Sequence, residues 1–399
     1  MSTTDTFDAI VVGGGPSGAT AADDLARAGR RVLLLDRAGR IKPCGGAIPP
    51  RLIRDFAIPD DLLVARVRAA RMVSPAAREV EMPIEGGFVG MVDREVFDEF
   101  LRDRAAAHGA IRRTGTFHRF ERDPHGMATI IYTDPDGAEQ RVRGRVVIGA
   151  DGAKSQVARQ CVAGWQRVRY VFAYHEIVRS PRHGSGEGLA AFDSARCDVW
   201  YQGKISPDFY GWVFPHGETT SVGSGSARKG FSLRKSVTDL RAAAGLAGQP
   251  TLRREGAPIP LRPMKRWDNG RDVVLAGDAA GVVAPASGEG IYYAMAGGRF
   301  AADAAEAFLA TGRATALAGA RRAFMRLHGR VFWILGMMQW FWYSSDKRRE
   351  TFVKLCRDPD IQRLTWDAYM NKELVRSRPA AHVRVFFKDL AHLLGFASA

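Results

Sequence analysis

The chain of 399 residues is long enough to bury a large core and suggests two or three domains. Hydrophobic residues make up 46% and charged residues 25%, which is typical of a folded soluble protein. The net charge of +15 favours anionic lipid or phosphate as a partner, although an arginine-rich composition alone gives the same value. The four cysteines show no CxxC spacing, so we expect neither a disulfide framework nor a metal site.

Two further patterns are lacking. The polar N-terminal residues 1–7 have no basic segment followed by an apolar one, so we expect no secretory signal. No stretch approaches the roughly 20 apolar residues of a transmembrane helix, and residues 331–343 come nearest.

Residues 7–37 predict a strand, a glycine turn, a helix and a second strand. The GxGxxG spacing of the turn allows a sharp bend, close approach of a pyrophosphate and close helix packing. The helix start offers free N–H groups to the phosphates, and an acidic residue ends the second strand, where it can bond a ribose. We therefore assign a dinucleotide site to Gly13, Gly15, Pro16, Ser17, Gly18, Asp36 and Arg37.

Two later segments favour FAD over NAD, because a flavin extends well beyond its adenosine half. Residues 145–159 predict an apolar strand that breaks at Asp151. Residues 272–309 predict a strand that ends at Gly277 and Asp278, followed by a helix of small residues. We expect Asp151 and Gly277 to approach the cofactor and Asp278 to bond the ribitol hydroxyls.

The helix predicted after Asp278 is expected to begin near Gly288, Gly290 and Ile291 and to direct its positive end at the flavin ring. Residues 7–310 resemble the FAD-dependent reductases and hydroxylases built like para-hydroxybenzoate hydroxylase. In those proteins an arginine on a helix reaches the cofactor, and Arg94 in the segment VDREVFDEFL is the match. A solvated residue at a helix start is the alternative for this arginine.

Residues 159–262 are short, aromatic and β-rich segments separated by turn residues, which predicts an antiparallel sheet covering the flavin. In the segment DFYGWVFPHG, Tyr210, Trp212 and Phe214 alternate on one face, and Pro215 is expected to end the strand. This face is either the core side of a half-buried strand or an aromatic wall for a large apolar substrate.

Two motifs resemble the geranylgeranyl reductase family. Residues 210–217 match its YxWxFPxG pattern, and KPCGG at residues 42–46 matches the PxxCGG-like loop of its photosynthetic branch. The resemblance implies saturation of three of the four double bonds of a geranylgeranyl tail, on (bacterio)chlorophyll or on geranylgeranyl diphosphate, with FAD as cofactor and NADPH as the usual electron donor. Without a second dinucleotide fingerprint we do not place an NADPH site, and reduced ferredoxin stays an alternative donor.

The resemblance also implies partners and a location. We expect a peripheral protein on the cytoplasmic side of the intracytoplasmic photosynthetic membrane. Its partners would be the membrane surface and other proteins of pigment biosynthesis, and we expect no nucleic acid.

The KPCGG loop carries a candidate proton donor. An isolated double bond has no carbonyl to take up charge, so hydride addition needs an acid nearby. Gly45 and Gly46 would let the loop backbone approach the flavin, and the Cys44 thiol is the candidate acid. Simple packing beside the flavin also explains this cysteine, and Tyr210 or a bound water is a rival donor.

The C-terminal region, residues 321–399, is basic and contains Trp333, Trp340, Trp342 and Trp366. Its apolar stretch at residues 331–343 lies between basic flanks and suits an interfacial helix. A helix packed on the FAD-binding domain is the alternative.

The expected fold is α/β, with a Rossmann-like FAD-binding domain of the para-hydroxybenzoate hydroxylase and glutathione reductase type, an antiparallel-sheet substrate domain and a helical C-terminal extension. The FAD-binding domain would comprise residues 1–75, 91–160 and 265–320, the substrate domain residues 76–90 and 161–264, and the extension residues 321–399.

Two other functions fit this fold. One is a flavin-dependent monooxygenase or halogenase, although the halogenase WxWxIP strand differs here at Tyr210 and Phe214. The other is a non-enzymatic, flavin-bearing factor that binds pigments during assembly.

Overall fold

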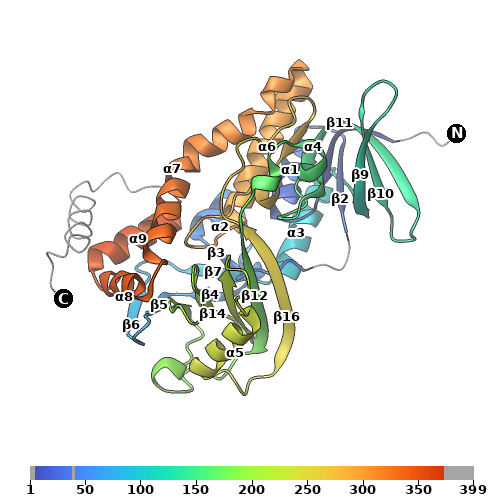
Figure 1. Ribbon diagram of the computed structural model, residues 1–399. Coiled ribbons are helices and arrows are strands. Elements are labelled where there is room, and N and C mark those ends of the chain that lie inside the picture. The colour runs from blue at the N-terminus through green and yellow to red at the C-terminus, as the bar shows by residue number, and fades with distance from the viewer. Residues whose placement is uncertain (1–4, 38–40, 373–399) are drawn as a thin grey trace. The chain divides into compact units, whose positions relative to one another are not determined.

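The computed structural model describes residues 5–37 and 41–372, which group into two compact units (Figure 1). Unit 1 comprises Met1–Gly46, Val92–Ala173 and Glu255–Gln339, and unit 2 comprises Ala47–Met91, Tyr174–Arg254 and Trp340–Ala399. The sequence-based domain boundaries differ, because they place residues 47–75 with the FAD-binding segments and separate residues 321–399. Those boundaries stay a prediction.

Unit 1 is built on a seven-stranded sheet of order β8-β2-β1-β11-β10-β9, in which β17 also pairs with β11. Its strands are β1 (Thr6–Val12), β2 (Val32–Asp36), β8 (Ile111–Thr114), β9 (Thr116–Arg122), β10 (Ala128–Thr133), β11 (Glu139–Gly149) and β17 (Val273–Leu275). The pairs β1–β2, β1–β11, β2–β8 and β11–β17 are parallel, as the predicted nucleotide fold requires. The pairs β9–β10 and β10–β11 are antiparallel.

Helices cover this sheet because its central strands β1 and β2 carry buried apolar runs, residues 9–12 and 32–35. They are α1 (Pro16–Arg27), α3 (Arg94–Ala107), α4 (Gln156–Cys161) and α6 (Ile291–Thr311), and most of α7 (Gly319–Trp342) also belongs to unit 1. Small residues let α1 and α6 approach closely: a Cβ atom on Gly298 would lie 2.2 Å from the carbonyl oxygen of Ser17. The small-residue composition of the late helix therefore serves helix packing as well as the cofactor site.

Unit 2 holds most of a second seven-stranded sheet of order β16-β12-β15-β14-β13-β5-β6 and a three-stranded sheet of order β3-β7-β4. Their strands are β3 (Ala47–Ile48), β4 (Leu63–Val67), β5 (Ala69–Val73), β6 (Glu79–Pro83), β7 (Val89–Val92), β12 (Tyr170–Arg179), β13 (Arg196–Trp200), β14 (Gly211–His216), β15 (Thr219–Ser226) and β16 (Thr251–Pro260). The pairs β13–β14, β14–β15 and β5–β6 are antiparallel, but β13 and β5 are parallel. The expected antiparallel sheet therefore contains a parallel pair, β13 with β5, which joins strands far apart in the sequence.

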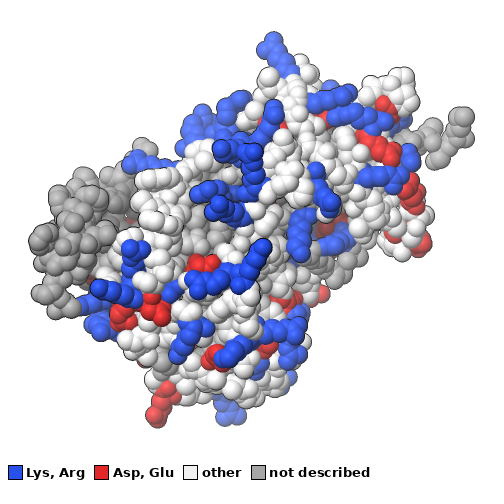
Figure 2. Space-filling model, in the orientation of Figure 1, with Lys and Arg blue, Asp and Glu red and all other residues white. Residues whose placement is uncertain are grey.

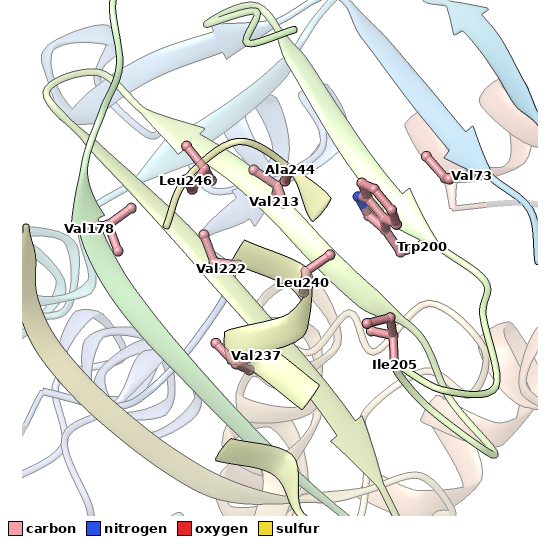
Figure 3. Close-up of a cluster of buried hydrophobic side chains, with 10 residues drawn as sticks. All are labelled: Val73, Val178, Trp200, Ile205, Val213, Val222, Val237, Leu240, Ala244 and Leu246. Carbon is pink, nitrogen blue, oxygen red and sulfur yellow. The ribbon is translucent and has the colours of Figure 1, made fainter. Parts of the chain in front are cut away.

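The core of unit 2 lies between this sheet and α5 (Leu233–Ala243). Figure 3 shows Val237 and Leu240 of the helix in one cluster with Val213 and Val222 of the sheet, with Trp200 at one side. These side chains are almost completely buried, so α5 holds β14 and β15 firmly in place.

Short helices complete unit 2: α2 (Pro50–Asp55), α8 (Asp346–Leu355) and α9 (Pro359–Asn371). Trp366, Tyr369 and Met370 of α9 pack against a buried cluster that includes Val67 and Met91. The described part of the C-terminal region is therefore in part a structural component of unit 2. None of the helices within residues 5–37 and 41–372 is both long and apolar enough to cross a membrane.

Candidate cofactor and substrate sites

The N-terminus of α1 is open to an anion. Gly15 is its N-cap, and none of the described side chains caps the helix. A Cβ atom on Gly15 would have no described atom within 4 Å, whereas one on Gly18 would lie 1.8 Å from the Gly13 carbonyl oxygen. The buried hydroxyl of Ser17 has no hydrogen-bond partner among the described residues. Free N–H groups, open space and an unused hydroxyl together fit a pyrophosphate.

Asp36 ends β2 as predicted, next to this helix start. Arg102 of α3 donates from Nη1 to the Asp36 carboxylate and to the Gly14 carbonyl, both at 3.2 Å. Burial raises the pKa of the Asp36 carboxyl, whereas the Gly14 backbone N–H and the charge of Arg102 oppose this rise. Arg102 thus fixes the carboxylate expected to bond a ribose, while Arg37 lies exposed just beyond the strand.

The third predicted segment forms a buried 3₁₀ turn, Gly277–Ala280, after β17. Gly277 has φ +61°, and a Cβ atom on it would lie 2.7 Å from the Cβ of Ser17, so the turn passes close to α1. Helix α6 begins at Ile291 with Gly290 as N-cap, again without a capping side chain among the described residues. The helix start expected near Gly288 and Gly290 is confirmed.

Asp151 is engaged differently from the expectation of a cofactor contact. Its carboxylate accepts hydrogen bonds from the Ser155 hydroxyl and from the backbone N–H groups of Gln156 and Val157. It thus binds the N-terminus of α4, where burial raises its pKa. A cofactor role for Asp151 stays a prediction.

The KPCGG loop is held by side chains of unit 1. The Lys42 ammonium forms an ion pair with the buried Asp278 carboxylate. The Gly46 backbone N–H donates to Cys44 Sγ at 3.4 Å, and Arg94 interacts electrostatically with Cys44. The loop therefore brings the candidate acid and the candidate ribitol ligand into one linked set of contacts.

Arg94 is buried, so the alternative of a solvated helix-start residue is wrong. Its guanidinium donates to both carboxylate oxygens of Asp98, at 2.8 and 2.7 Å. Burial alone would lower the pKa of Arg94, but Asp98 and Cys44 together raise it above its ordinary value. A fixed positive charge therefore lies beside the Cys44 side chain.

The aromatic strand lies in unit 2. Tyr210 directly precedes β14, and its ring lies 6.1 Å from that of Trp212, which lies 6.4 Å from that of Phe214. The one-face pattern is confirmed, but Tyr210 and Trp212 are buried and Phe214 packs against the cluster that α9 covers. The strand is thus a core element as well as a candidate wall.

The expectation that Pro215 ends the strand is wrong. β14 continues to His216, and Pro215 is aligned with Thr220 of β15. The register of β13 with β14 covers only residues 211–213, so on that side Pro215 lies past the last paired residue. A missing N–H group is tolerated at such a position.

Comparisons with known proteins identify the family. A family model described as "Lycopene cyclase protein" matches residues 8–377. The geranylgeranyl diphosphate reductase of Rhodobacter capsulatus is 58% identical over 390 residues and is covered, like this chain, to 98%. The chloroplastic geranylgeranyl diphosphate reductase of Oryza sativa is 35% identical over 406 residues, covering 96% of this chain and 85% of that protein. The chain belongs to the geranylgeranyl reductase family.

Solved structures agree on the fold of this family member. The geranylgeranyl bacteriochlorophyll reductase-like protein of Thermoplasma acidophilum matches with a TM-score of 0.79 at 21% identity, covering 95% of this chain and 100% of that chain. Aklavinone-11 hydroxylase, solved with FAD and aklavinone, matches with a TM-score of 0.59 at 22% identity over 78% of this chain and 64% of that one. The fold is the expected FAD-dependent hydroxylase-like fold, and the residues at the α1 N-terminus fit such a cofactor.

Three contacts of this reductase family member were not predicted from its sequence. Lys42 lies within the KPCGG motif, but its partner is 236 residues away. Arg102 lies outside the sequence motifs, so no pattern pointed to its contact with Asp36. Ser221 bonds to the indole of Trp212, and only its place on a neighbouring strand could have suggested this.

Proposed function

We propose that this chain is an FAD-dependent oxidoreductase that saturates three double bonds of a geranylgeranyl tail, forming the phytyl tail of bacteriochlorophyll. The observation that carries this proposal is the 58% identity to the Rhodobacter capsulatus geranylgeranyl diphosphate reductase over 98% of both chains. The substrate is geranylgeranyl diphosphate or a geranylgeranylated (bacterio)chlorophyll, and NADPH is the proposed electron donor.

The cofactor is held by residues of unit 1. Gly15 and Ser17 bind the pyrophosphate at the start of α1, and Asp36, positioned by Arg102, binds the ribose. Asp278 binds the ribitol, and the N-terminus of α6 offers its N–H groups and positive dipole end to the ring. Reduced FAD supplies the hydride for each saturation.

A proton must arrive at the other carbon of each double bond, because an isolated alkene has no carbonyl to accept charge. Cys44 is the proposed donor. The Gly46 N–H group donates to its sulfur and the Arg94 guanidinium interacts with it electrostatically, so both would stabilise the thiolate that remains after proton transfer. Tyr210 and a bound water stay rival donors.

The tail itself needs an apolar path. Transfer of about twenty carbons to water costs on the order of 15 kcal/mol, at about 0.8 kcal/mol per CH₂ group. The proposed wall is the aromatic face of Tyr210, Trp212 and Phe214, together with Pro215. The same cost favours a protein that collects its substrate at a bilayer.

A membrane contact is proposed for α7. Arg322, Arg326 and Arg330 are exposed at spacings of four residues, and Trp333 and Met337 continue this stripe with 67% and 46% exposure. Figure 2 shows basic side chains over the part of the surface that α7 forms. Cations beside large apolar side chains suit an anionic bilayer surface, and each basic residue contributes about 1 kcal/mol there.

This contact supports a peripheral location on the cytoplasmic side of the photosynthetic membrane. Other proteins of pigment biosynthesis are further proposed partners, because the bulky product has to pass to another site without entering water. Coflotation with photosynthetic membranes tests the location.

Anaerobic incubation with NADPH and either free geranylgeranyl diphosphate or the geranylgeranylated pigment tests the reaction, with mass spectrometry as readout. We expect mass gains of two hydrogen atoms per saturation and no dependence on oxygen. Oxygen-dependent insertion of a hydroxyl or halogen would show the monooxygenase or halogenase alternative instead. Tight pigment binding without turnover would show an assembly factor.

A further inference from the structure

The ion pair between Lys42 and Asp278 ties the KPCGG loop to the rigid core of unit 1. Asp278 lies in a 3₁₀ turn whose four residues are all buried, and only 5% of its side chain is exposed. Lys42 precedes the motif cysteine by two residues, and 38% of its side chain is exposed. The ammonium group of a partly exposed side chain therefore reaches a buried carboxylate.

The rest of the loop is held differently. The Gly46 carbonyl accepts a hydrogen bond from the Val92 backbone N–H at 2.9 Å, the Gly46 N–H donates to Cys44 Sγ at 3.4 Å, and Arg94 interacts electrostatically with Cys44. Residues 41–46 have no regular secondary structure, so these contacts and the Lys42 ion pair help to hold them in place. Cys44 thus lies between an attachment at the start of α3 and an attachment at Asp278.

We propose that Lys42 is a positioning residue that couples the ribitol-binding carboxylate of Asp278 to the placement of the Cys44 thiol. This inference rests on the proposed FAD site. Lys42 acts through the loop and does not itself react. A buried carboxylate needs a partner, so the pair is kept, and with it the loop is held against the cofactor side of the unit. A ligand that binds Asp278 would then also change how tightly the loop that contains Cys44 is held.

Thiol alkylation measures this coupling without relying on turnover. Full-length protein purified with FAD is treated with iodoacetamide in a Cys161→Ser background, because Cys161 is partly exposed while Cys197 and Cys356 are buried. Peptide mass spectrometry follows Cys44 alone. The variants are Lys42→Met, which keeps the stem but removes the charge, and Lys42→Arg, which keeps the charge. Lys265→Met, at an exposed lysine of the same unit, is the matched control.

We expect Lys42→Met to raise the alkylation rate of Cys44 several-fold and to weaken FAD retention, with Lys42→Arg and Lys265→Met near the parent rates. Asp278→Asn should raise the rate similarly, and the double variant should add nothing, since both changes remove one attachment. If Lys42 acted only as a nearby positive charge, Lys42→Met would instead lower the alkylation rate of Cys44, because losing a cation disfavours the reactive thiolate.

An unchanged or slower rate in Lys42→Met, or an additive double variant, would overturn the proposal. Circular dichroism and thermal denaturation show whether each variant is folded. If a variant does not fold, Lys42→Gln and the Lys42→Arg comparison still decide the outcome. Failure of the reductase assay would leave this result standing, since alkylation needs no substrate. Absence of bound flavin in the parent protein would instead refute the FAD site on which the inference rests.

Discussion

The indole Nε1 of Trp212 donates a hydrogen bond to the hydroxyl oxygen of Ser221 at 3.1 Å, and both side chains are buried. Ser221 also lies 2.9 Å from Nδ1 of His175. The serine hydroxyl thus accepts from the indole and also hydrogen-bonds to the imidazole of His175. Trp212, the tryptophan of the family motif, is therefore held in a fixed orientation.

Gly223 provides the space that the Trp212 indole occupies. It is aligned with Trp212 across β14 and β15, and a Cβ atom on it would lie 2.1 Å from the indole Cζ2. Gly223→Ala should displace the indole and lower the free energy of unfolding by about 1–3 kcal/mol, as overpacking does. Thermal denaturation and near-ultraviolet circular dichroism measure the two effects.

The matched control is Gly248→Ala, where a Cβ atom would meet open space. Trp212→Phe removes the second ring that makes the clash, so the double variant with Gly223→Ala should lose less stability than the sum of the single changes. Additive losses would mean that the indole does not occupy the space above Gly223.

Two glycines of the GxGxxG turn should respond differently to alanine. Gly15 has φ −72° and open space around it, so Gly15→Ala should fold normally but place a methyl group where the pyrophosphate approaches. We expect FAD affinity to fall roughly tenfold or more, a loss of at least about 1.4 kcal/mol. Gly18→Ala should fail to fold, because its Cβ would meet the Gly13 carbonyl. Equal FAD binding by Gly15→Ala and the parent protein would contradict the site.

Cys44→Ser tests the proton donor. A hydroxyl is far less acidic than a thiol, so alkene reduction should slow by about 100-fold, the lower range for a general acid, while flavin reduction by NADPH is little changed. Stopped-flow absorbance follows the flavin, and mass spectrometry follows the tail. Cys161→Ser, in the same unit, is the control. Undiminished alkene turnover, measured where that step limits the rate, would return Cys44 to a packing role.

Membrane contact through α7 is tested with Arg322, Arg326 and Arg330 changed to glutamine. Binding to anionic liposomes should weaken by about 3 kcal/mol at low salt, and the effect should shrink as salt screens the charges. The control changes Lys154, Lys265 and Arg266, which are exposed elsewhere on unit 1. Equal flotation of both triple variants would show that α7 does not form the membrane contact.

Two cruder tests of the C-terminal region are ruled out by the structure. Deleting residues 321–399 would remove Trp366 and Tyr369, which pack on the core of unit 2. Arg349 is buried and donates to the backbone carbonyls of Pro207 and Tyr343, so neutralising it would disturb the fold as well as the charge.

Local patterns in the sequence predicted the elements that local physics determines. The strand, glycine turn, helix and strand of residues 7–37, the end of β2 at Asp36 and the start of α6 at Gly290 all follow from periodicity, glycine and helix-start chemistry. The strands around Trp212 follow from alternation.

Contacts between distant segments could not be read in this way. Lys42 and Asp278, or Ser221 and His175, become partners only because the sheets bring their segments together. The continuation of β14 past Pro215 likewise depends on how far β13 extends, which the residues around the proline do not encode. Sequence therefore locates the motifs, whereas tertiary placement determines which charges and hydrogen bonds tune them.

Reduction should be stepwise, with partly saturated tails appearing in order of time. The described chain contains one GxGxxG turn and one Asp278-type turn, so we infer one flavin and one hydride per cycle. Neighbouring double bonds lie about 5 Å apart in an extended tail, whereas a reacting pair must approach to about 3–3.5 Å, so one pose cannot serve three bonds. The tail has to shift between cycles.

A fixed Trp212 makes this shift testable. If the tail moves along an immobile indole, Trp212→Phe should change the ratio of partly reduced intermediates as well as the total rate. The substitution removes one ring and the hydrogen bond to Ser221. Mass spectrometry of single-turnover reactions, limited to one equivalent of NADPH, measures the ratio directly. Gly248→Ala should leave it unchanged. Only unreduced and fully reduced tails under this limit would refute stepwise reduction, and an unaltered ratio in Trp212→Phe would remove Trp212 from the wall.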